Sequence, residues 1–200
     1  MKKIISHIST AAILLGSLAL ATPAAAAQPA APGQNKLTCS VDAPATCTVT
    51  KSGTTATLDT NSGGAAAVYL AGFNTSFYGV RVGQVTKLSN TYTGTPGVDP
   101  HWSIPIDLGG IHDGFTDYFV FVSFSTCNNG AGLVDIINDP TCTIYDGRNA
   151  LVSYPNWLAF TQANTNDYIS LNDYYAFIIA DSSQAGPWTV SNMIVGKPGK

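Results

Sequence analysis

A polar segment in the middle of the chain, VDPHWSIPIDLGGIHDGFTD (residues 98–117), gathers the side chains best suited to hold an ion. Its nitrogen and oxygen donors are Asp99, His101, Asp107, His112, Asp113 and Asp117. Loop carboxylates bind Ca²⁺, and a mixed His/Asp set binds transition metals. We predict Asp107, Asp113 and Asp117 as candidate metal ligands, with calcium as the candidate ion and no other cofactor. The alternative is that Asp and Gly only form and cap the turns.

Aromatic side chains in and before this segment suggest a second chemistry. Trp102 lies within the segment, and Tyr92 lies in the polar stretch that precedes it. Flat aromatic rings pack against the apolar faces of sugar rings, while Asp and Asn side chains hydrogen-bond to hydroxyl groups. The candidate ligand-binding residues are Tyr92, Asp99, His101, Trp102 and Asp135. For each tryptophan the alternative is a place in the core of a β-sheet protein.

Catalytic motifs are absent from the sequence. The chain has no Glu, which removes His-Glu-x-x-His metalloprotease chemistry and Glu-based glycosidase pairs. It also has no Gly-x-Ser-x-Gly elbow, Walker loop or dinucleotide fingerprint. After its first 27 residues only His101 and His112 remain as histidines, and neither lies beside a recognisable nucleophile motif. We assign no catalytic residue, although a hydrolase that uses Asp and His stays open as an alternative.

The first 27 residues have the organisation of a secretory signal peptide. Lys2 and Lys3 precede an apolar stretch, and Ala25 and Ala27 form a small-x-small cleavage site before Gln28. We expect residues 28–36 to be a flexible Ala/Pro linker and residues 37–200 to be one domain. The predicted location is therefore periplasmic or extracellular, and we expect no membrane span in the mature chain.

The charge of the mature chain argues against some partners. Removing Lys2 and Lys3 from nine basic residues leaves seven against twelve acidic residues, a net charge of −5. No run of Lys or Arg exists, so we expect no nucleic-acid partner. The predicted partners are an extracellular glycan or a surface protein.

Four cysteines predict two disulfides in an exported chain. Cys39 and Cys47 flank a short turn and are predicted to pair with each other. Cys127 and Cys142 are the ends of the segment CNNGAGLVDIINDPTC (127–142). This segment is compatible either with a strand within a meander or with a stapled loop, by which we mean a loop closed by a disulfide. Six residues of strand span about 20 Å, too far for a disulfide between its ends, so we favour the stapled loop with a bridge between Cys127 and Cys142.

The rest of the chain predicts an all-β fold. Short strand-like runs alternate with turns rich in Gly, Asn, Asp and Pro, and no amphipathic helix of ten or more residues is evident. The run at 117–126 is apolar on both faces and should be a central strand. Pro105 favours an edge strand or bulge for 101–108, and 156–162 is expected to be another strand. These patterns favour an antiparallel β-sandwich, jelly-roll-like, with two disulfides.

The closing segments DYYAFIIAD (173–181) and GPWTVSNMIV (186–195) resemble the last strands of carbohydrate-binding jelly rolls. The resemblance implies the fold and, by analogy alone, a glycan ligand. The predicted function is a secreted, non-catalytic binding module for glycans or another extracellular ligand. The alternative is a structural or adhesive surface protein that acts by protein–protein contacts. We expect a binding site, if present, to form from loops 89–101, 107–117 and 128–141 together.

Overall fold

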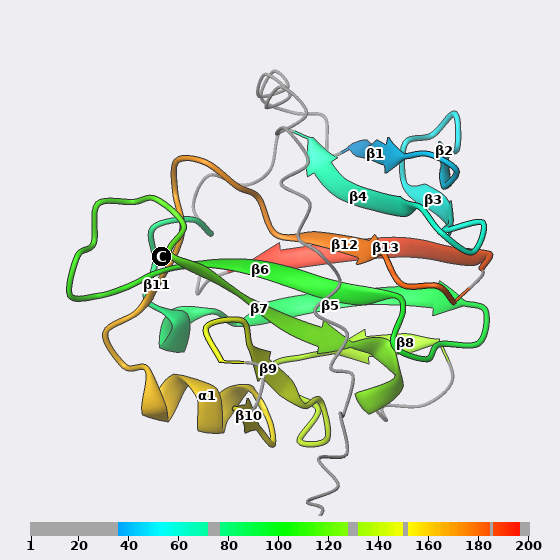
Figure 1. Ribbon diagram of the computed structural model, residues 1–200. Helices are drawn as coiled ribbons and strands as arrows, with labels where there is room; N and C mark the ends of the chain where they lie inside the picture. The colour runs from blue at the N-terminus through cyan, green and yellow to red at the C-terminus, as the bar shows by residue number, and fades with distance from the viewer. Residues whose placement is uncertain (1–35, 72–76, 128–131, 150–151, 185, 197–200) are drawn as a thin grey trace, which may run out of the picture.

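The fold is built from short strands with a single α-helix in the described part of the chain (Figure 1). The computed structural model describes residues 36–71, 77–127, 132–149, 152–184 and 186–196. The predicted signal peptide and all but the last residue of the predicted linker lie outside these ranges. The elements in chain order are β1 (Lys36–Asp42), β2 (Thr46–Val49), β3 (Thr55–Asp59), β4 (Ala65–Ala71), η1 (Val82–Gln84), β5 (Lys87–Thr93), β6 (His101–Asp107), β7 (Tyr118–Ser123), η2 (Phe124–Thr126), β8 (Leu133–Asp135), β9 (Ile144–Asp146), β10 (Ser153–Tyr154), α1 (Trp157–Ala163), β11 (Tyr168–Ile169), β12 (Phe177–Ala180) and β13 (Trp188–Gly196).

The strands form two antiparallel sheets. One has eight strands in the order β1-β4-β12-β6-β7-β9-β10, with β11 pairing β6, and the other has five in the order β2-β3-β13-β5-β8. Both sheets contribute to one buried hydrophobic cluster. The predicted mostly-β fold with two disulfides is therefore confirmed.

Strand β7 illustrates how the sequence pattern produces these sheets. Tyr118, Val120 and Val122 are buried in the core, whereas the residues between them are only partly buried. This alternation is the period of two that a pleated strand imposes on its side chains. The strand pairs with β6 on one side and β9 on the other, so a central strand within residues 117–126 is confirmed. It is shorter than predicted, because Phe124–Thr126 form η2.

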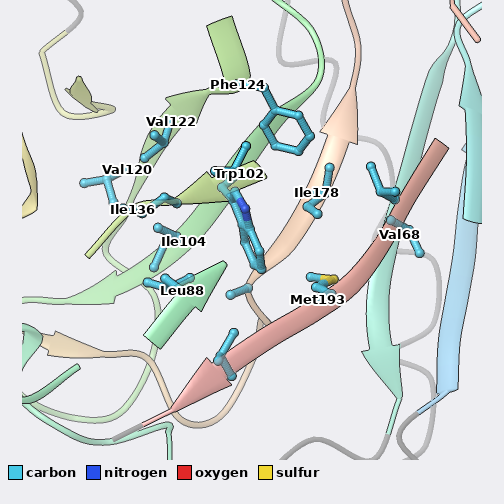
Figure 2. Packing of buried hydrophobic residues seen from close by; sticks show 14 of the residues in the cluster. Val68, Leu88, Trp102, Ile104, Val120, Val122, Phe124, Ile136, Ile178 and Met193 are labelled. Atoms are coloured by element: carbon cyan, nitrogen blue, oxygen red, sulfur yellow. The ribbon is translucent and has the colours of Figure 1, made fainter. Parts of the chain in front are cut away.

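The core is organised around Trp102 (Figure 2). Its side chain has no exposed surface, and its indole Nε1 donates a hydrogen bond of 2.8 Å to Oδ1 of Asn90. Trp102 belongs to β6 in the eight-stranded sheet, whereas Asn90 belongs to β5 in the five-stranded sheet. This hydrogen bond therefore joins the two sheets inside the core, and it satisfies two polar groups that would be costly to bury unpaired.

Strand β6 is not the edge or bulged strand that Pro105 suggested. It lies between β7 and β12, and β11 also pairs with it. On that second side β12 pairs with His101–Ser103 and β11 pairs with Ile106 and Asp107. Pro105 therefore falls in the gap between two partner strands, where the hydrogen-bond ladder is already interrupted, and its missing N–H group is tolerated inside a central strand.

Residues 157–162 belong to helix α1, so the strand predicted at 156–162 is wrong. Oδ1 of Asn156 accepts a hydrogen bond of 2.9 Å from the backbone N of Ala159, which is a helix N-cap. Trp157, Phe160 and Thr161 are the buried residues of the helix. Their spacing of three and four residues is the helical period, which a seven-residue segment is too short to display clearly.

The disulfide between Cys39 and Cys47 confirms the predicted pairing. The two cysteines lie on β1 and β2, as expected, but these strands do not pair with each other. Strand β1 pairs with β4 in the eight-stranded sheet, and β2 pairs with β3 in the five-stranded sheet. The bridge therefore ties one sheet to the other at the start of the described domain.

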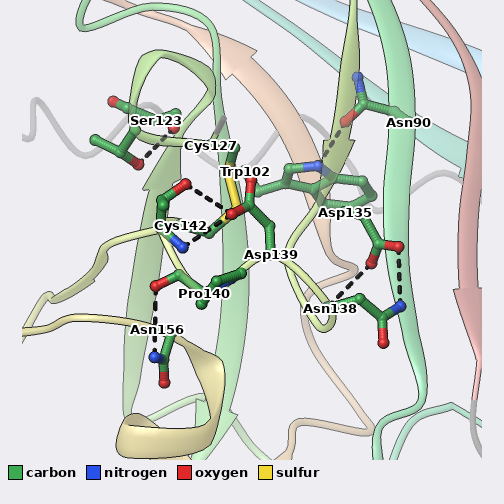
Figure 3. The surroundings of a disulfide bond; sticks show 12 residues. Asn90, Trp102, Ser123, Cys127, Asp135, Asn138, Asp139, Pro140, Cys142 and Asn156 are labelled. Atoms are coloured by element: carbon green, nitrogen blue, oxygen red, sulfur yellow. Dashed lines mark hydrogen bonds between the residues drawn. A yellow bond between two sulfur atoms is a disulfide. The ribbon is translucent and has the colours of Figure 1, made fainter. Parts of the chain in front are cut away.

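The disulfide between Cys127 and Cys142 is also as predicted (Figure 3). The expectation that a bridge excludes a strand in this loop is wrong, because β8 spans only three residues and pairs with β5. After β8 the chain turns back, with the backbone N of Asp139 donating to the carbonyl O of Asp135 over 2.9 Å. One short strand and one tight turn thus fit inside the ring that the disulfide closes.

Removing either disulfide is expected to lower the free energy of unfolding. The bridges have sequence separations of 15 and 8 residues, so a chain-entropy estimate gives about 3 and about 2.5 kcal/mol. The variants Cys127→Ser/Cys142→Ser and Cys39→Ser/Cys47→Ser should each unfold at lower urea than the parent. A urea midpoint that neither variant shifts would contradict a stabilising role for the bridges.

The variant Trp102→Phe tests the place of the indole in the core. It leaves Oδ1 of Asn90 buried without its donor, so we expect a loss of about 1–3 kcal/mol in addition to the loss of packing. The midpoint of urea unfolding measures this loss. If Trp102 were instead a surface residue, the variant would unfold at the same urea concentration as the parent.

Candidate functional site

Strand β6 divides its side chains between the core and the outer face of the eight-stranded sheet. Trp102, Ile104 and Ile106 belong to the hydrophobic core. The alternate positions, which face the opposite way, are His101, Ser103, Pro105 and Asp107. Two of the polar residues that were predicted to carry function, His101 and Asp107, therefore lie at the two ends of one central strand, on the side away from the core.

Aromatic residues form a row across this outer face, in register with Ser103. Residues directly opposite one another in antiparallel strands project from the same face of a sheet. The row runs from Tyr69 on β4 through Phe177 on β12 and Ser103 on β6 to Phe121 on β7 and Tyr145 on β9. Five neighbouring strands thus contribute to one line of side chains.

Further ring contacts widen this row into a surface. The ring of Phe119 lies 6.4 Å from that of Phe121, 6.0 Å from that of Phe177 and 5.3 Å from that of Tyr174, between centroids. We define the outer aromatic face as the set Tyr69, Phe119, Phe121, Tyr145, Tyr174 and Phe177. Tyr145 is 40% exposed and Tyr174 is 43% exposed, and the other four are partly buried. None of the six carries a charge at neutral pH, so the surface suits the apolar side of a neutral ligand.

Asp99 and His101 lie at one end of the outer aromatic face. Nδ1 of His101 lies 3.3 Å from Oδ1 of Asp99, and the imidazole ring contacts the ring of Phe121 at 5.7 Å between centroids. Oδ2 of Asp99 accepts hydrogen bonds from the backbone N atoms of Asp181 and Ser182. Burial alone would raise the pKa of the Asp99 carboxyl, but hydrogen bonds from His101 and Ser182 hold it below its usual value.

Asp107 and His112 form a second pair at the other end of β6. Nδ1 of His112 lies 3.0 Å from Oδ2 of Asp107, and the His112 ring stacks on Tyr168 at 3.7 Å between centroids. The Asp107 side chain is 1% exposed, whereas that of His112 is 45% exposed. Oδ1 of Asp107 is buried without a hydrogen-bond partner among the described residues. The pair anchors the loop 108–117 to the end of β6.

The three loops expected to share one site do not do so. Loops 89–101 and 128–141 are neighbours, because the backbone N of Tyr92 donates to the carbonyl O of Gly132. Loop 107–117 follows the opposite end of β6, which lies about 20 Å away over six residues of strand. The single-site arrangement is therefore corrected: the strand that separates Asp99 from Asp107 along the chain also separates them in space.

The five predicted ligand-binding residues are distributed over different parts of the fold. Asp99 and His101 lie together, as described, whereas Trp102 is enclosed in the core and offers no surface to a ligand. The ring of Tyr92, on the five-stranded sheet, packs against Phe124 at 5.1 Å between centroids. The carboxylate of Asp135 accepts hydrogen bonds from the backbone and side chain of Asn138, and so stabilises the turn after β8 (Figure 3).

The three predicted metal ligands each hold a turn of loop 107–117. Oδ2 of Asp107 accepts from the backbone N of Gly114, Oδ1 of Asp113 from that of Phe115, and Oδ2 of Asp117 from that of Leu108. Among the described residues, these three aspartates do not form a group with converging ligand atoms. The local hydrogen bonds are those expected of Asp as a turn-forming residue.

The sequence patterns did not lead us to predict the residues of the outer aromatic face. The signal was present in part: Phe119 and Phe121 alternate with core residues of β7, and Tyr145 stands between two buried residues of β9. For the run at 117–126, the apolar pattern predicts only a central strand. The alternate aromatic positions instead make one partly exposed surface.

No family model, curated protein or solved structure matches the chain. Within the described ranges, none of the helices has both the length and the apolar character to cross a membrane. Inferences about function therefore rest on the chemistry of the side chains described above.

Acid is expected to destabilise the protein through three carboxyl groups. Burial would raise the pKa values of Asp99, Asp146 and Asp173, but hydrogen bonds to each carboxylate lower them below their usual value. A carboxyl group with a lowered pKa in the folded state contributes stability above its unfolded pKa, and this contribution is lost as the pH falls through the folded value. Asp181 is exposed as a residue, but desolvation of its carboxyl group and the charge of Asp99 raise its pKa, so it acts in the opposite sense.

Urea unfolding at pH 6 and at pH 3 measures this effect, since the loss should begin below about pH 4. The variant Asp99→Asn lacks one of the three contributions and should lose less stability between the two pH values than the parent does. Equal stability of the parent at both pH values would contradict the stabilising role of these three carboxylates.

Proposed function

We propose that the protein is a secreted, non-catalytic binding module for glycans and that the outer aromatic face is its binding surface. The observation that carries the proposal is the in-register row of Tyr69, Phe177, Phe121 and Tyr145 across neighbouring strands. Side chains on a paired sheet are held in place before a ligand arrives, so binding costs little ordering entropy.

The chemistry of the surface favours a sugar over other ligands. Aromatic rings bind the apolar C–H faces of pyranose rings, and the absence of charge within the outer aromatic face suits a neutral molecule. A ligand lying on the rings also needs partners for its hydroxyl groups at the margin. At one end of β6, Asp181 supplies a carboxylate and His101 supplies an imidazole whose ring contacts Phe121.

We also propose that the two sheets form a jelly-roll sandwich. The orders β3-β13-β5-β8 and β4-β12-β6-β7 support this, because the chain passes from one sheet to the other between β3 and β4, β5 and β6, β7 and β8, and β12 and β13. Strands β6 and β7 are neighbours within one sheet. Chain crossings of this kind are typical of two-sheet jelly rolls. In this arrangement the outer aromatic face is the exterior of one sheet, on the rigid part of the fold.

Export is part of the proposal. Two disulfides in the described chain support an oxidising compartment. The signal-peptide pattern of residues 1–27 supports the same location. An extracellular or periplasmic protein meets structural and storage glycans, which agrees with the proposed ligand class.

A surface protein that binds other proteins is the second candidate. Exposed apolar residues at the margin of the outer aromatic face favour it: Phe115 and Leu171 are each 53% exposed. The segments that carry them are joined, because the backbone N of Leu171 donates to the carbonyl O of Gly114. Exposed apolar surface of this kind also marks protein contacts.

Glycan binding should depend on the outer aromatic face. In pull-downs with insoluble cellulose, chitin and xylan, and on a glycan array, we expect the parent to bind at least one glycan. Tyr145→Ala and Phe121→Ala should each weaken that binding at least about tenfold, because truncated aromatic anchors dominate such surfaces.

The matched control is Ile194→Ala on β13 of the other sheet, whose side chain is 45% exposed. It should bind as the parent does. Retained affinity in both aromatic variants would contradict the proposal. Failure of the parent to bind any glycan, together with capture of a protein ligand that Tyr145→Ala abolishes, would favour the adhesive alternative.

A further inference from the structure

We propose that Asp99, His101 and Asp181 form a binding site for a divalent transition-metal ion of the Zn²⁺ class. One ligand atom from each of the three side chains lies within 4.8 Å of the ligand atoms of the other two. The site joins the start of β6 to the residue that follows β12, at the end of the outer aromatic face. It is distinct from the loop 107–117, where a metal was first expected.

The backbone holds these three residues in place. Asp99 has no exposed surface, and its Oδ2 accepts hydrogen bonds of 3.1 Å from the backbone N of Asp181 and 2.7 Å from that of Ser182. The same carboxylate contacts Nδ1 of His101 through its other oxygen. Asp99 thus fixes both the imidazole and the chain segment that carries the second carboxylate, which is the preorganisation that a metal site needs.

The negative charge of the two carboxylates favours a bound cation. Two carboxylates lie close together, and no Lys or Arg of the described chain forms an ion pair with either of them. A divalent ion would neutralise both charges and take the place of the missing basic side chain.

The donor set selects the class of ion. Ca²⁺ prefers six to eight oxygen ligands, and Mg²⁺ keeps most of its water, whereas an imidazole nitrogen with two carboxylates suits Zn²⁺ and its neighbours. Three protein ligands would leave a fourth tetrahedral position for water or another molecule. The described residues contain one other group with close donor atoms, Cys127, Asp139 and Cys142, but its two sulfur atoms are joined in a disulfide.

Calorimetric titration of the tag-free, EDTA-treated protein with ZnCl₂ tests the site. We expect one ion bound per chain, a higher melting temperature with Zn²⁺, and no comparable effect of CaCl₂. Asp181→Asn should weaken Zn²⁺ binding at least about tenfold. Because Asp181 is exposed, this variant keeps the fold, and its melting temperature without metal verifies that.

Two controls separate this site from other Asp and His residues. Asp113→Asn changes an exposed turn carboxylate, and His112→Gln removes the other imidazole, so both should bind Zn²⁺ as the parent does. The proposal is overturned if the parent binds no Zn²⁺, if Asp181→Asn binds it with unchanged affinity, or if His112→Gln abolishes binding. None of these measurements uses a glycan, so the result is independent of the proposed function.

Discussion

Hydrogen bonding of β6 along both of its edges is the constraint on which the rest of the structure depends. A strand paired on both sides cannot rotate about its axis, so its side chains are assigned strictly to two faces. Trp102, Ile104 and Ile106 fill the core, and His101, Ser103 and Asp107 are placed on the other side. A shift of one residue would turn the polar residues into the hydrophobic core and the indole out of it. The core therefore determines which groups are presented on the outer face.

The two sheets are held together by interactions of different kinds. The disulfide between Cys39 and Cys47 links their edges covalently, and the hydrogen bond from Trp102 to Asn90 links them in the middle. The second disulfide stabilises the segment that contains β8, which pairs next to Asn90 on β5. A rigid support of this kind holds the partly exposed aromatic rings of the sheet face in fixed positions.

The sequence predicted features that depend on residues close together in the chain. The pairing of Cys39 with Cys47 and the presence of a central strand within 117–126 follow from local spacing and from apolar alternation. The outer aromatic face could not be predicted in this way, because it depends on the register between Tyr69 and Phe177, more than a hundred residues apart. The cluster of Asp181 with Asp99 and His101 also joins residues far apart in the chain, so local patterns could not predict it. Helix α1 was missed because seven residues do not separate a helical period from a strand.

The central claim is that ligands bind on the outer aromatic face of the eight-stranded sheet. Its most direct test is an NMR titration of the protein, labelled on its aromatic side chains, with soluble oligosaccharides from each major polysaccharide class. We predict that one class shifts the resonances of Phe121, Tyr145 and Tyr174 and leaves those of Tyr92 and Trp188, on the other sheet, unchanged. Shifts confined to Tyr92 and Trp188, or no shift with any class, would contradict the claim.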